Sequence, residues 1–295
     1  MTRPIVKKEQ LHGGRREGKP VPLSLSLMRF MFSRAGALVP GIMGRWAYHL
    51  WFRTRRFPEA AAGKRAAASS RREILQVDDM PVAIYTWGEG PAVLFVHGWS
   101  GRGSQVAAFV EPLNRAGYRV IAVDLPGHGD SPGNSTNILA CAAVLQAIAR
   151  DHGPVYAAIT HSFGGMVLAY AMKQGMPAGR VVSICAPANA EFLLETFAQT
   201  LRMHKSVIDD MWRRLEQRFG GDFGRRIATT NNVKGLIVPA LVIHDEDDAG
   251  VPWQHGRMIA DAWHGAEFLK TKGLGHGRIL RDAQTIQAAV DFISR

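Results

Sequence analysis

The sequence predicts a doubly wound α/β fold, in which helices cover both faces of a mostly parallel sheet. Two observations support this prediction. Short runs rich in Val, Ile and Ala alternate with longer segments whose apolar residues recur at helical spacing. A strand–turn–helix pattern, V-Y-A-A-I-T-H-S-F-G-G-M-V-L-A-Y-A, occupies residues 155–171. The length of 295 residues suits one large domain with additions.

The core elements follow one another from residue 73 onward. A β-hairpin is expected first, around D-D-M-P, and six buried strands follow it. The apolar runs place the strands at 74–77, 82–87, 92–97, 119–124, 155–160, 181–185, 240–244 and 266–270. Helical spacing places helices at 104–116, 137–152, 164–174, 253–263 and 278–294.

One long segment interrupts the alternation of strands and helices. Between Cys185 and Ala240 no strand pattern occurs, and apolar residues hold helical spacing instead. We therefore expect inserted helices at about 187–235. Ligands of such sheets bind beyond the carboxyl ends of the strands, so we interpret the insertion as a cap over a site there. The alternative is a surface insertion without a role.

The positive charge of the chain is concentrated at its N-terminal end. Residues 1–72 hold 16 lysines and arginines against three acidic residues, whereas residues 73–295 are close to neutral. The sequence therefore predicts a basic, partly helical N-terminal extension, 1–72, before the main domain, 73–295. We expect disorder in 1–22 and a linker in 58–72. Because the charge belongs to one segment, no nucleic-acid partner is predicted.

Residues 23–57 have the pattern of two amphipathic helices that carry arginines. Two interpretations remain open, namely a peripheral contact with anionic membrane or a partner, and a helical extension packed on the protein's own surface. No stretch approaches the roughly 20 uncharged apolar residues of a membrane span. Arginines also interrupt any signal-peptide core, so we expect a cytoplasmic protein, with membrane association through 23–57 as the alternative.

The turn in the middle of the chain carries a family resemblance. Its sequence T-H-S-F-G, at 160–164, resembles the nucleophile elbow G-x-S-x-G of the α/β-hydrolase superfamily. The resemblance implies that Ser162 is the nucleophile. Small residues are needed where strand and helix nearly touch, and Gly164 and Gly165 supply them on the helix side. Thr160 departs from the pattern, because glycine is usual at that position.

A second motif resembles the loop that follows the third strand in this superfamily. It reads L-F-V-H-G-W at 94–99. The resemblance implies that the backbone N–H groups of Trp99 and Phe163 stabilise an oxyanion, and that His97 is structural. A third motif, D-L-P-G-H-G-D-S at 124–131, resembles another loop of the same superfamily. The resemblance implies that Asp124 and His128 brace this loop through hydrogen bonds.

The remaining partners of a serine nucleophile come later in the chain, in the order the superfamily requires. H-D-E-D-D-A-G-V-P, at 244–252, resembles the acid-bearing turn and implies Asp248 as the acid, with Asp247 as the alternative; Asp245 stands where glycine is usual. G-L-G-H-G-R, at 273–278, resembles the histidine loop and implies His276 as the base.

Together these motifs imply a serine hydrolase that cleaves carboxylic esters of small to medium apolar acyl groups through an acyl-enzyme. Five residues near the motifs or in the insertion are candidates for an apolar acyl pocket: Trp99, Met166, Phe192, Phe197 and Trp253. The alternatives are a thioesterase, amidase, lactonase or C–C hydrolase, or a hydrolase-like binding protein without turnover. We expect a small-molecule ester substrate, with no metal and no cofactor.

Overall fold

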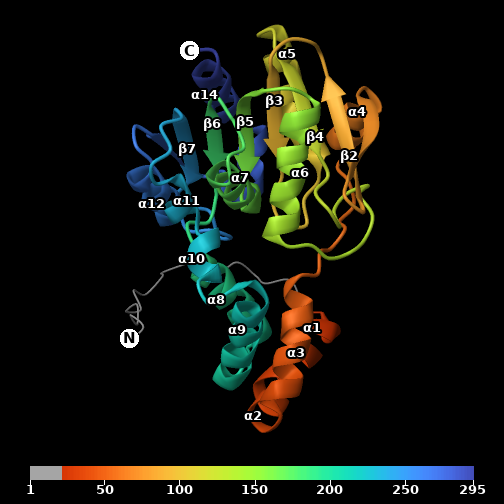
Figure 1. Ribbon diagram of the computed structural model, residues 1–295, viewed down its shortest axis with the longest axis vertical. Coiled ribbons are helices and arrows are strands. Elements are labelled where there is room, and N and C mark those ends of the chain that lie inside the picture. Colours follow the sequence, from red (N-terminus) through yellow and green to blue (C-terminus); the bar gives the residue numbers. More distant parts are fainter. Residues whose placement is uncertain (1–21) are drawn as a thin grey trace.

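An eight-stranded sheet forms the centre of the computed structural model, which describes residues 22–295 (Figure 1). The strands lie in the order β1-β2-β4-β3-β5-β6-β7-β8. β2 pairs antiparallel with β1 and β4, and the other pairs are parallel, which confirms the predicted fold class. The strands are β1 (Arg71–Val77), β2 (Met80–Trp87), β3 (Ala92–Val96), β4 (Arg119–Val123), β5 (Val155–His161), β6 (Val181–Ile184), β7 (Ala240–Asp245) and β8 (Glu267–Thr271).

Helices cover both faces of this sheet, and two separate apolar cores result. Alternate residues of β3 belong to different cores, since successive side chains of a strand point to opposite faces. One face packs against α6 (Ile138–Asp151), α7 (Phe163–Lys173) and α12 (Gln254–Ala262). The other packs against α5 (Ala107–Arg115) and α14 (Ala283–Ile293). A 3₁₀ turn, Gly103–Val106, precedes α5.

The helix expected at 278–294 is interrupted, and this corrects the prediction. A short turn α13 (Gly275–Arg278) and a 3₁₀ turn, Ile279–Arg281, come first, and α14 begins after Asp282. Asp282 has extended backbone angles, and its carboxylate accepts a 2.8 Å hydrogen bond from the N–H of Thr285. This is an N-cap, so Asp282 begins a new helix instead of continuing the previous one.

Four helices occupy the predicted insertion, which we call the inserted helices: α8 (Ala190–Leu201), α9 (Lys205–Phe219), α10 (Phe223–Ile227) and α11 (Thr229–Val233). α8, α9 and α10 lie below the sheet in Figure 1, beyond the carboxyl ends of its parallel strands. α11 instead contacts α7 and α12 of the main domain.

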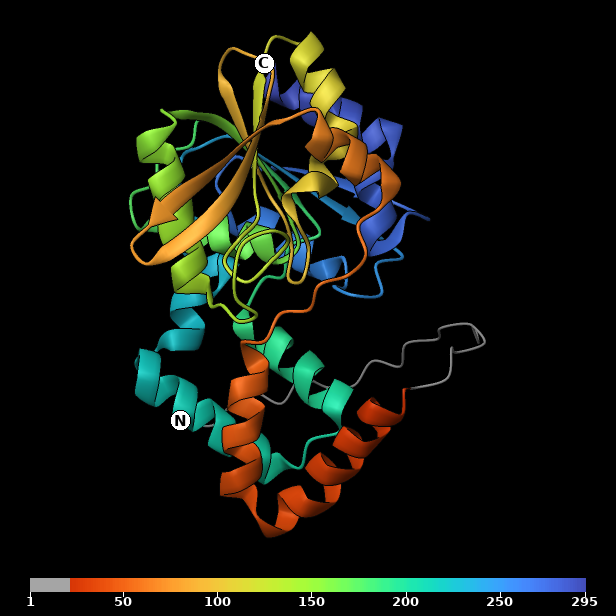
Figure 2. The same cartoon turned by 90° about the vertical axis from the view of Figure 1, so that its right-hand side faces the viewer.

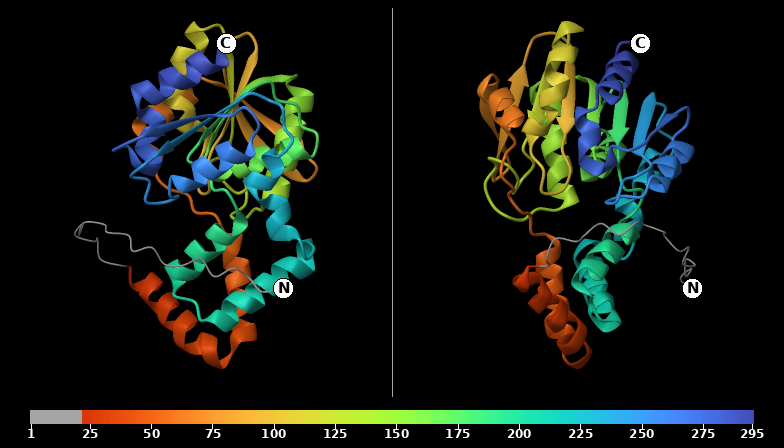
Figure 3. Two further views of the ribbon diagram at one scale, coloured as in Figure 1. Left: turned by 90° about the vertical axis from the view of Figure 1, so that its left-hand side faces the viewer. Right: turned by 180° about the vertical axis from the view of Figure 1, so that it is seen from behind.

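The N-terminal helices, which we call the arm (residues 23–51), pack beside the inserted helices (Figures 2 and 3). The arm comprises α1 (Leu23–Phe30), a π-helical turn (Met31–Ala35), α2 (Gly36–Leu38) and α3 (Pro40–Trp51). α3 contacts α9 along much of its length. The prediction for 1–22 falls on residues of which only Pro22 is described. No helix within residues 22–295 combines the length and the apolar character that a membrane span requires.

The stretch interpreted as a linker is attached to the main domain, and with the residues before it we call it the connecting segment (residues 53–70). It contains α4 (Ala61–Ala68), as expected of an Ala-rich sequence with high helix propensity. The hydroxyl of Thr54 donates a 2.6 Å hydrogen bond to the carbonyl of Gly127. The indole of Trp87 donates to the carbonyl of Ala66 at 2.8 Å. These bonds fix the segment at both ends.

Candidate active site

Ser162 occupies a sharp turn between β5 and α7. Its backbone angles are φ 53° and ψ −123°, a conformation that L-residues rarely adopt. The turn brings α7 close to the neighbouring strand, since a Cβ atom added at Gly164 would lie 2.3 Å from the carbonyl oxygen of Val96. Glycine is therefore required at position 164. Ser162 is half-buried at the end of β5, in the strand–turn–helix geometry expected of a nucleophile elbow.

Thr160, the departure from the elbow pattern, is fully buried in this turn. Its hydroxyl lies 3.5 Å from the carbonyl of Val182 on the adjacent strand. A Cβ atom added at Gly165 would lie 3.3 Å from the same hydroxyl. The missing side chain at Gly165 thus leaves the room that the branched side chain of Thr160 fills. The elbow keeps its geometry without a glycine at position 160.

The structure brings Asp248 and His276 together from the ends of β7 and β8. Asp248 Oδ2 lies 2.7 Å from His276 Nδ1, and Asp248 Oδ1 accepts from the N–H groups of Gly250 and Val251 at 2.8 and 2.9 Å. Burial favours the neutral acid, but hydrogen bonds from His244 and His276 outweigh it, and the pKa of Asp248 stays well below its usual range. The carboxylate is therefore ionised and holds a proton on His276 Nδ1.

Asp245 fastens the loop that carries His276, a role that sequence reasoning missed. Its buried carboxylate accepts from the N–H of Gly275 at 2.7 Å and from the N–H of Leu274 at 3.1 Å. It also accepts from the hydroxyl of Thr271 at 2.8 Å. Burial works to raise the pKa of Asp245, but these hydrogen bonds lower it. These three donors lie 26 to 30 positions after Asp245, so only the tertiary structure shows this role.

Asp247, the alternative acid, points elsewhere. Its Oδ2 accepts a 3.0 Å hydrogen bond from the N–H of Gly273. It contributes to the wall of a cavity instead of contacting the His276 ring. The geometry therefore favours Asp248 over Asp247 as the partner of His276.

His161 links the elbow directly to the His276 loop. Its Nε2 lies 2.8 Å from the carbonyl oxygen of His276, and the two rings lie 4.7 Å apart. Burial lowers the pKa of His161 to about 4, so the ring is neutral near pH 7 and donates through Nε2. The residue next to Ser162 thus bonds to the backbone of His276. Sequence reasoning assigned His161 no role, although its place beside the serine is a signal.

The two residues predicted to donate to an oxyanion lie side by side. The rings of Trp99 and Phe163 meet edge to face at 5.1 Å. Phe163 is the first residue of α7, so its N–H has no acceptor within the helix. A Cβ atom added at Gly98 would lie 2.9 Å from the Cβ of Ser162, which shows how closely the loop after β3 approaches the elbow.

The connecting segment holds this same loop. Ser100, next to Trp99, has φ 58°, and its hydroxyl accepts a 3.0 Å hydrogen bond from the N–H of Arg55. The guanidinium of Arg56 donates to the carbonyls of Gly129 and Ser131 at 2.9 and 2.6 Å. Backbone groups of the loops around the site are thus tied to residues that precede the main domain.

His97, Asp124 and His128 have the structural surroundings that the resemblance implies. His97 Nε2 accepts from the N–H of Leu125 at 3.1 Å. The carboxylate of Asp124 accepts from the N–H groups of Gly103 and Asp130 at 2.6 and 2.7 Å. Burial lowers the pKa of His97 to about 3 and that of His128 to about 4, so both rings are neutral.

The five residues predicted for an acyl pocket lie on different elements of the structure: Trp99, Met166, Phe192, Phe197 and Trp253. The ring of Phe192 lies 4.3 Å from His255, and that of Phe197 lies 5.3 Å from Trp51 of the arm. Trp253 lies 6.5 Å from a ring on β8. The ring contacts of Phe192, Phe197 and Trp253 thus reach α12, the arm and β8, respectively.

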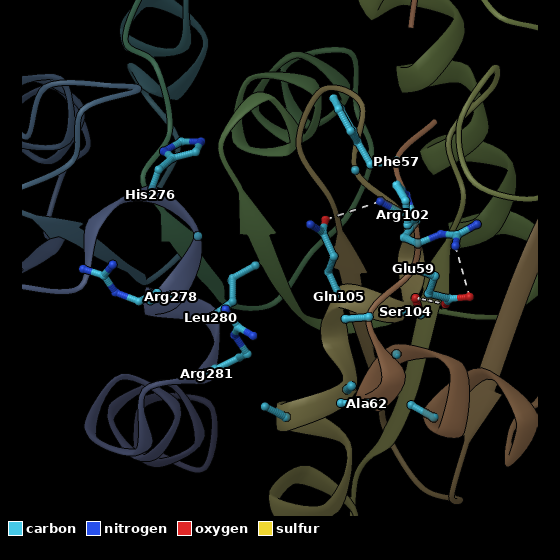
Figure 4. A pocket seen from close by; sticks show the side chains of 18 of the residues that line it. Phe57, Glu59, Ala62, Arg102, Ser104, Gln105, His276, Arg278, Leu280 and Arg281 are labelled. Carbon is cyan, nitrogen blue, oxygen red and sulfur yellow. Dashed lines mark hydrogen bonds and ion pairs between the residues drawn. The ribbon is translucent and has the colours of Figure 1, made fainter. Parts of the chain in front are cut away.

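A cavity of about 1410 Å³ opens beside His276 (Figure 4). One wall is the His276 loop with Leu280 and Arg281, and the facing wall includes Phe57 and Ala62 of the connecting segment. The sequence does not reveal this cavity, because residues 58–72, several of which line it, have the composition of a linker. None of the five predicted acyl-pocket residues belongs to its lining.

One group of side chains in the described part of the chain has the spacing of a metal site. Cys185, Asp248 and His276 offer atoms within 4.8 Å of one another. Burial raises the pKa of the Cys185 thiol, so the group stays protonated, whereas metals bind the thiolate. Because Asp248 and His276 already bind each other, we interpret the group as part of the Ser162 site.

Comparison with known proteins supports the class of protein that this fold and site indicate. Residues 93–288 match the model of the alpha/beta hydrolase family, to which the chain therefore belongs. The non-heme chloroperoxidase of Burkholderia pyrrocinia is 27% identical over 72% of this chain and 95% of its own. The bifunctional esterase/perhydrolase DCH of Acinetobacter calcoaceticus is 25% identical over 71% of this chain and 94% of its own.

One solved structure resembles this chain beyond the main domain. The crystal structure of a bacterial membrane phospholipase A aligns with a TM-score of 0.60 and 18% identity. The alignment covers 92% of this chain and 97% of that protein. At this identity the likeness shows the fold alone.

Proposed function

We propose that this alpha/beta hydrolase cleaves carboxylic esters of small to medium apolar acyl groups through an acyl-enzyme. One observation carries the proposal, namely the 2.7 Å contact between Asp248 and His276 beside the strained turn of Ser162. A serine hydroxyl needs a base, and the base needs an acid that fixes its tautomer. The esterase activity in the name of the Acinetobacter relative agrees with this reaction class.

In the proposed first step, Ser162 Oγ attacks the ester carbonyl carbon while its proton moves to Nε2 of His276. The ionised Asp248 stabilises the resulting imidazolium through Nδ1. The backbone N–H groups of Trp99 and Phe163 would donate to the negative oxygen of the tetrahedral intermediate. The C–O bond to the alcohol then breaks, and the departing oxygen takes the proton from His276, which leaves the acyl group on Ser162.

The second step reverses these roles with water. A water molecule gives a proton to Nε2 of His276 and attacks the acyl carbon, and the acid departs as Ser162 recovers its proton. Water must reach the side of the ring that faces Ser162. The His276 side chain is 33% exposed and borders the cavity of about 1410 Å³, so solvent reaches the His276 ring. This exposure supports a hydrolytic outcome.

The proposal also covers substrate and location. The expected partner is a small-molecule ester, and the acyl group would contact the apolar residues Trp99, Met166, Phe192, Phe197 and Trp253. The inserted helices would act as a cap, since they lie beyond the carboxyl ends of the strands. We locate the enzyme in the cytoplasm, with residues 23–57 as a peripheral membrane contact. Thioester, amide, lactone and C–C substrates use the same serine chemistry and remain alternatives.

Labelling and substrate panels test the proposal together. A fluorescent organophosphonate should label the wild type and leave Ser162→Ala unlabelled. A series of p-nitrophenyl esters from acetate to laurate should show turnover that peaks at short to medium chains. Ser162→Ala should lower kcat by roughly 10⁴–10⁶-fold, as removal of a triad nucleophile does. Equal labelling of both proteins, or turnover retained in Ser162→Ala, would exclude Ser162 as the nucleophile.

A further inference from the structure

The arm has two faces with opposite surroundings. Its inner face is buried, since Phe32 and Ala47 are 0% exposed and Met43 is 3% exposed. Its outer face, which we define as Leu23, Leu27, Phe30, Leu38, Val39 and Ile42, is open to solvent. Leu23 and Leu38 are 89% and 83% exposed. The spacing of Leu23, Leu27 and Phe30 places them on one side of α1.

Exposed apolar side chains of this size are concentrated here. Twelve large apolar residues are exposed within residues 22–295, and six of them form the outer face, in a stretch of only 20 residues. Scattered exposed apolar residues are ordinary on a protein surface, but a contiguous group marks an interaction site. In Figures 1 and 2 the arm forms the end of the molecule most distant from the sheet, so the main domain does not cover this face.

The inner face is already occupied by the inserted helices. Arg29 Nε donates to the carbonyl of Thr200 on α8 at 2.8 Å, and the N–H of His204 donates to the carbonyl of Phe32 at 3.1 Å. A Cβ atom added at Gly36 would lie 2.8 Å from the Val207 side chain, so α9 packs directly on the backbone of the arm. These contacts fix the rotation of the arm and therefore keep the outer face directed away from the protein.

The charges around the outer face have a single sign. Between residues 22 and 57 the sequence has six arginines and no acidic residue. Arg34 and Arg45 are exposed; Arg34 lies in the π-helical turn that follows Phe30, and Arg45 lies on α3 with Ile42. Residues 1–21 add six lysines and arginines against two glutamates. Apolar side chains flanked by arginines are complementary to a bilayer with anionic headgroups, whereas a second copy of this surface would repel it.

We propose that the outer face of the arm binds anionic lipid bilayers, with its six apolar side chains inserted among the acyl chains and with Arg34 and Arg45 at the headgroups. When the bilayer is bound, the inner face of the arm remains packed against α8 and α9. The bilayer would then lie on the side of the molecule beyond the carboxyl ends of the strands, the side on which Ser162 lies. The lipid surface is the partner in this proposal, and binding does not depend on the proposed ester hydrolysis.

Vesicle sedimentation with the full-length protein tests the proposal. Vesicles of phosphatidylcholine with 30% phosphatidylglycerol should bind the wild type, and vesicles of phosphatidylcholine alone should bind it more weakly. Salt at 0.5 M should weaken the binding to the anionic vesicles, because it screens the arginines from the headgroups. The variant Phe30→Ser/Ile42→Ser should lose at least tenfold in partition coefficient. Arg34→Gln/Arg45→Gln should lose the preference for anionic vesicles.

A matched control replaces exposed isoleucines elsewhere. Ile74→Ser/Ile237→Ser removes apolar side chains that are 55% and 87% exposed, and it should bind vesicles as the wild type does. Phe30→Leu/Ile42→Val keeps the face apolar and should also bind. Thermal unfolding and hydrolysis of a soluble ester should be alike in all variants, which separates a loss of binding from a loss of folding or catalysis.

Three results would overturn the proposal. The wild type could fail to bind anionic vesicles, or Phe30→Ser/Ile42→Ser could bind as well as the wild type. The wild type could also sediment as a dimer that Phe30→Ser/Ile42→Ser dissociates, without vesicle binding, and the face would then join two copies of the chain. Failure of Ser162→Ala to lose activity would affect the proposed hydrolysis but not this result.

Discussion

The carboxylate of Asp245 accepts a 2.7 Å hydrogen bond from the backbone N–H of Gly275, the residue immediately before His276. The same carboxylate also accepts hydrogen bonds from the hydroxyl of Thr271 and the N–H of Leu274. The end of β7 is thereby bonded to the loop that follows β8. Asp248, three residues after Asp245, contacts the His276 ring itself. The acid-bearing turn thus controls both the backbone and the side chain of His276.

The first prediction concerns Asp245. Asp245→Gly installs the residue usual in the superfamily turn and removes the carboxylate that accepts from Thr271, Leu274 and Gly275. We expect kcat to fall by roughly 10²-fold with a smaller change in KM, because a misplacement near 1 Å costs about that much. The rate of organophosphonate labelling of Ser162 should fall in parallel. Asp245→Asn keeps one carbonyl acceptor and should retain more activity than Asp245→Gly.

A purely structural role for Asp245 would give a different result. Thermal unfolding of Asp245→Gly would then shift to lower temperature while kcat, measured well below the transition, stayed at the wild-type value. That combination would contradict a positioning role. Thr271→Val serves as a control, because it removes one donor and leaves the bonds from Gly275 and Leu274 intact.

The second prediction compares neighbouring acids. Asp248→Asn should lower kcat by roughly 10⁴-fold, since the amide favours the wrong tautomer of His276 and cannot stabilise its charged form. Asp247→Asn keeps an oxygen that can accept from Gly273, so we expect its kcat to stay within about tenfold of the wild type. Steady-state kinetics on one soluble ester measures both. A larger loss in Asp247→Asn would make Asp247 the catalytic acid.

Much of the fold could be predicted from the sequence because the central strands are buried. A buried parallel strand needs a continuous apolar run, and β3, β5 and β7 have one. Helix ends were less predictable. Asp282 begins α14 through its own side chain, in a stretch whose apolar periodicity continues without a break. Periodicity records which face is buried, whereas a cap depends on one side chain.

The candidate site residues that the sequence nominates belong to local motifs, whereas those that it misses depend on tertiary contacts. Ser162 and His276 follow from short sequence patterns at strand ends. The partners of Asp245 lie 26 to 30 positions further along the chain. The partner of His161 is His276, which lies 115 positions further along. The same limit applies to the packing of Phe197 against Trp51 of the arm, which the sequence does not reveal. Composition alone could not show which helix meets which.

The third prediction concerns stability at acid pH. Burial lowers the pKa of His97 to about 3 and those of His128 and His161 to about 4, from an ordinary value of 6.5. Below pH 6.5 the unfolded chain binds protons that the folded protein does not, so stability must fall as the pH falls. Each buried histidine contributes a slope of about 1.4 kcal/mol per pH unit until the pH reaches its folded pKa.

Urea unfolding between pH 7 and pH 4.5 measures this slope. His128→Gln removes one of these protons and should reduce the slope near pH 5 by about 1.4 kcal/mol per pH unit. His161→Gln should do the same and serves as the second variant if His128→Gln fails to fold. His264→Gln, at an exposed position, is the control. A slope unchanged in both buried variants would contradict the neutral state of these rings.

The last prediction tests whether the arm packs on α9 in solution. Gly44 faces Asp210, and a Cβ atom added there would lie 2.7 Å from the Asp210 Cβ and 2.2 Å from its Oδ2. Asp210 cannot move aside freely, because Arg213 and Arg214 hold its carboxylate at 2.8 and 2.7 Å. Gly44→Ala should therefore separate α3 from α9 and destabilise the protein by about 1–3 kcal/mol, as overpacking does.

Gly41 provides the matched control within the same helix. A Cβ atom added at Gly41 meets nothing within 4 Å, and alanine favours the helix over glycine by about 1 kcal/mol. Gly41→Ala should thus equal or exceed the wild type in urea unfolding, while Gly44→Ala unfolds earlier and its arm is cut faster by trypsin. Both should hydrolyse a soluble ester at the wild-type rate, because neither residue belongs to the proposed catalytic set. Equal stabilities of the two variants would mean that the arm does not pack on α9 and that its inner face is also exposed.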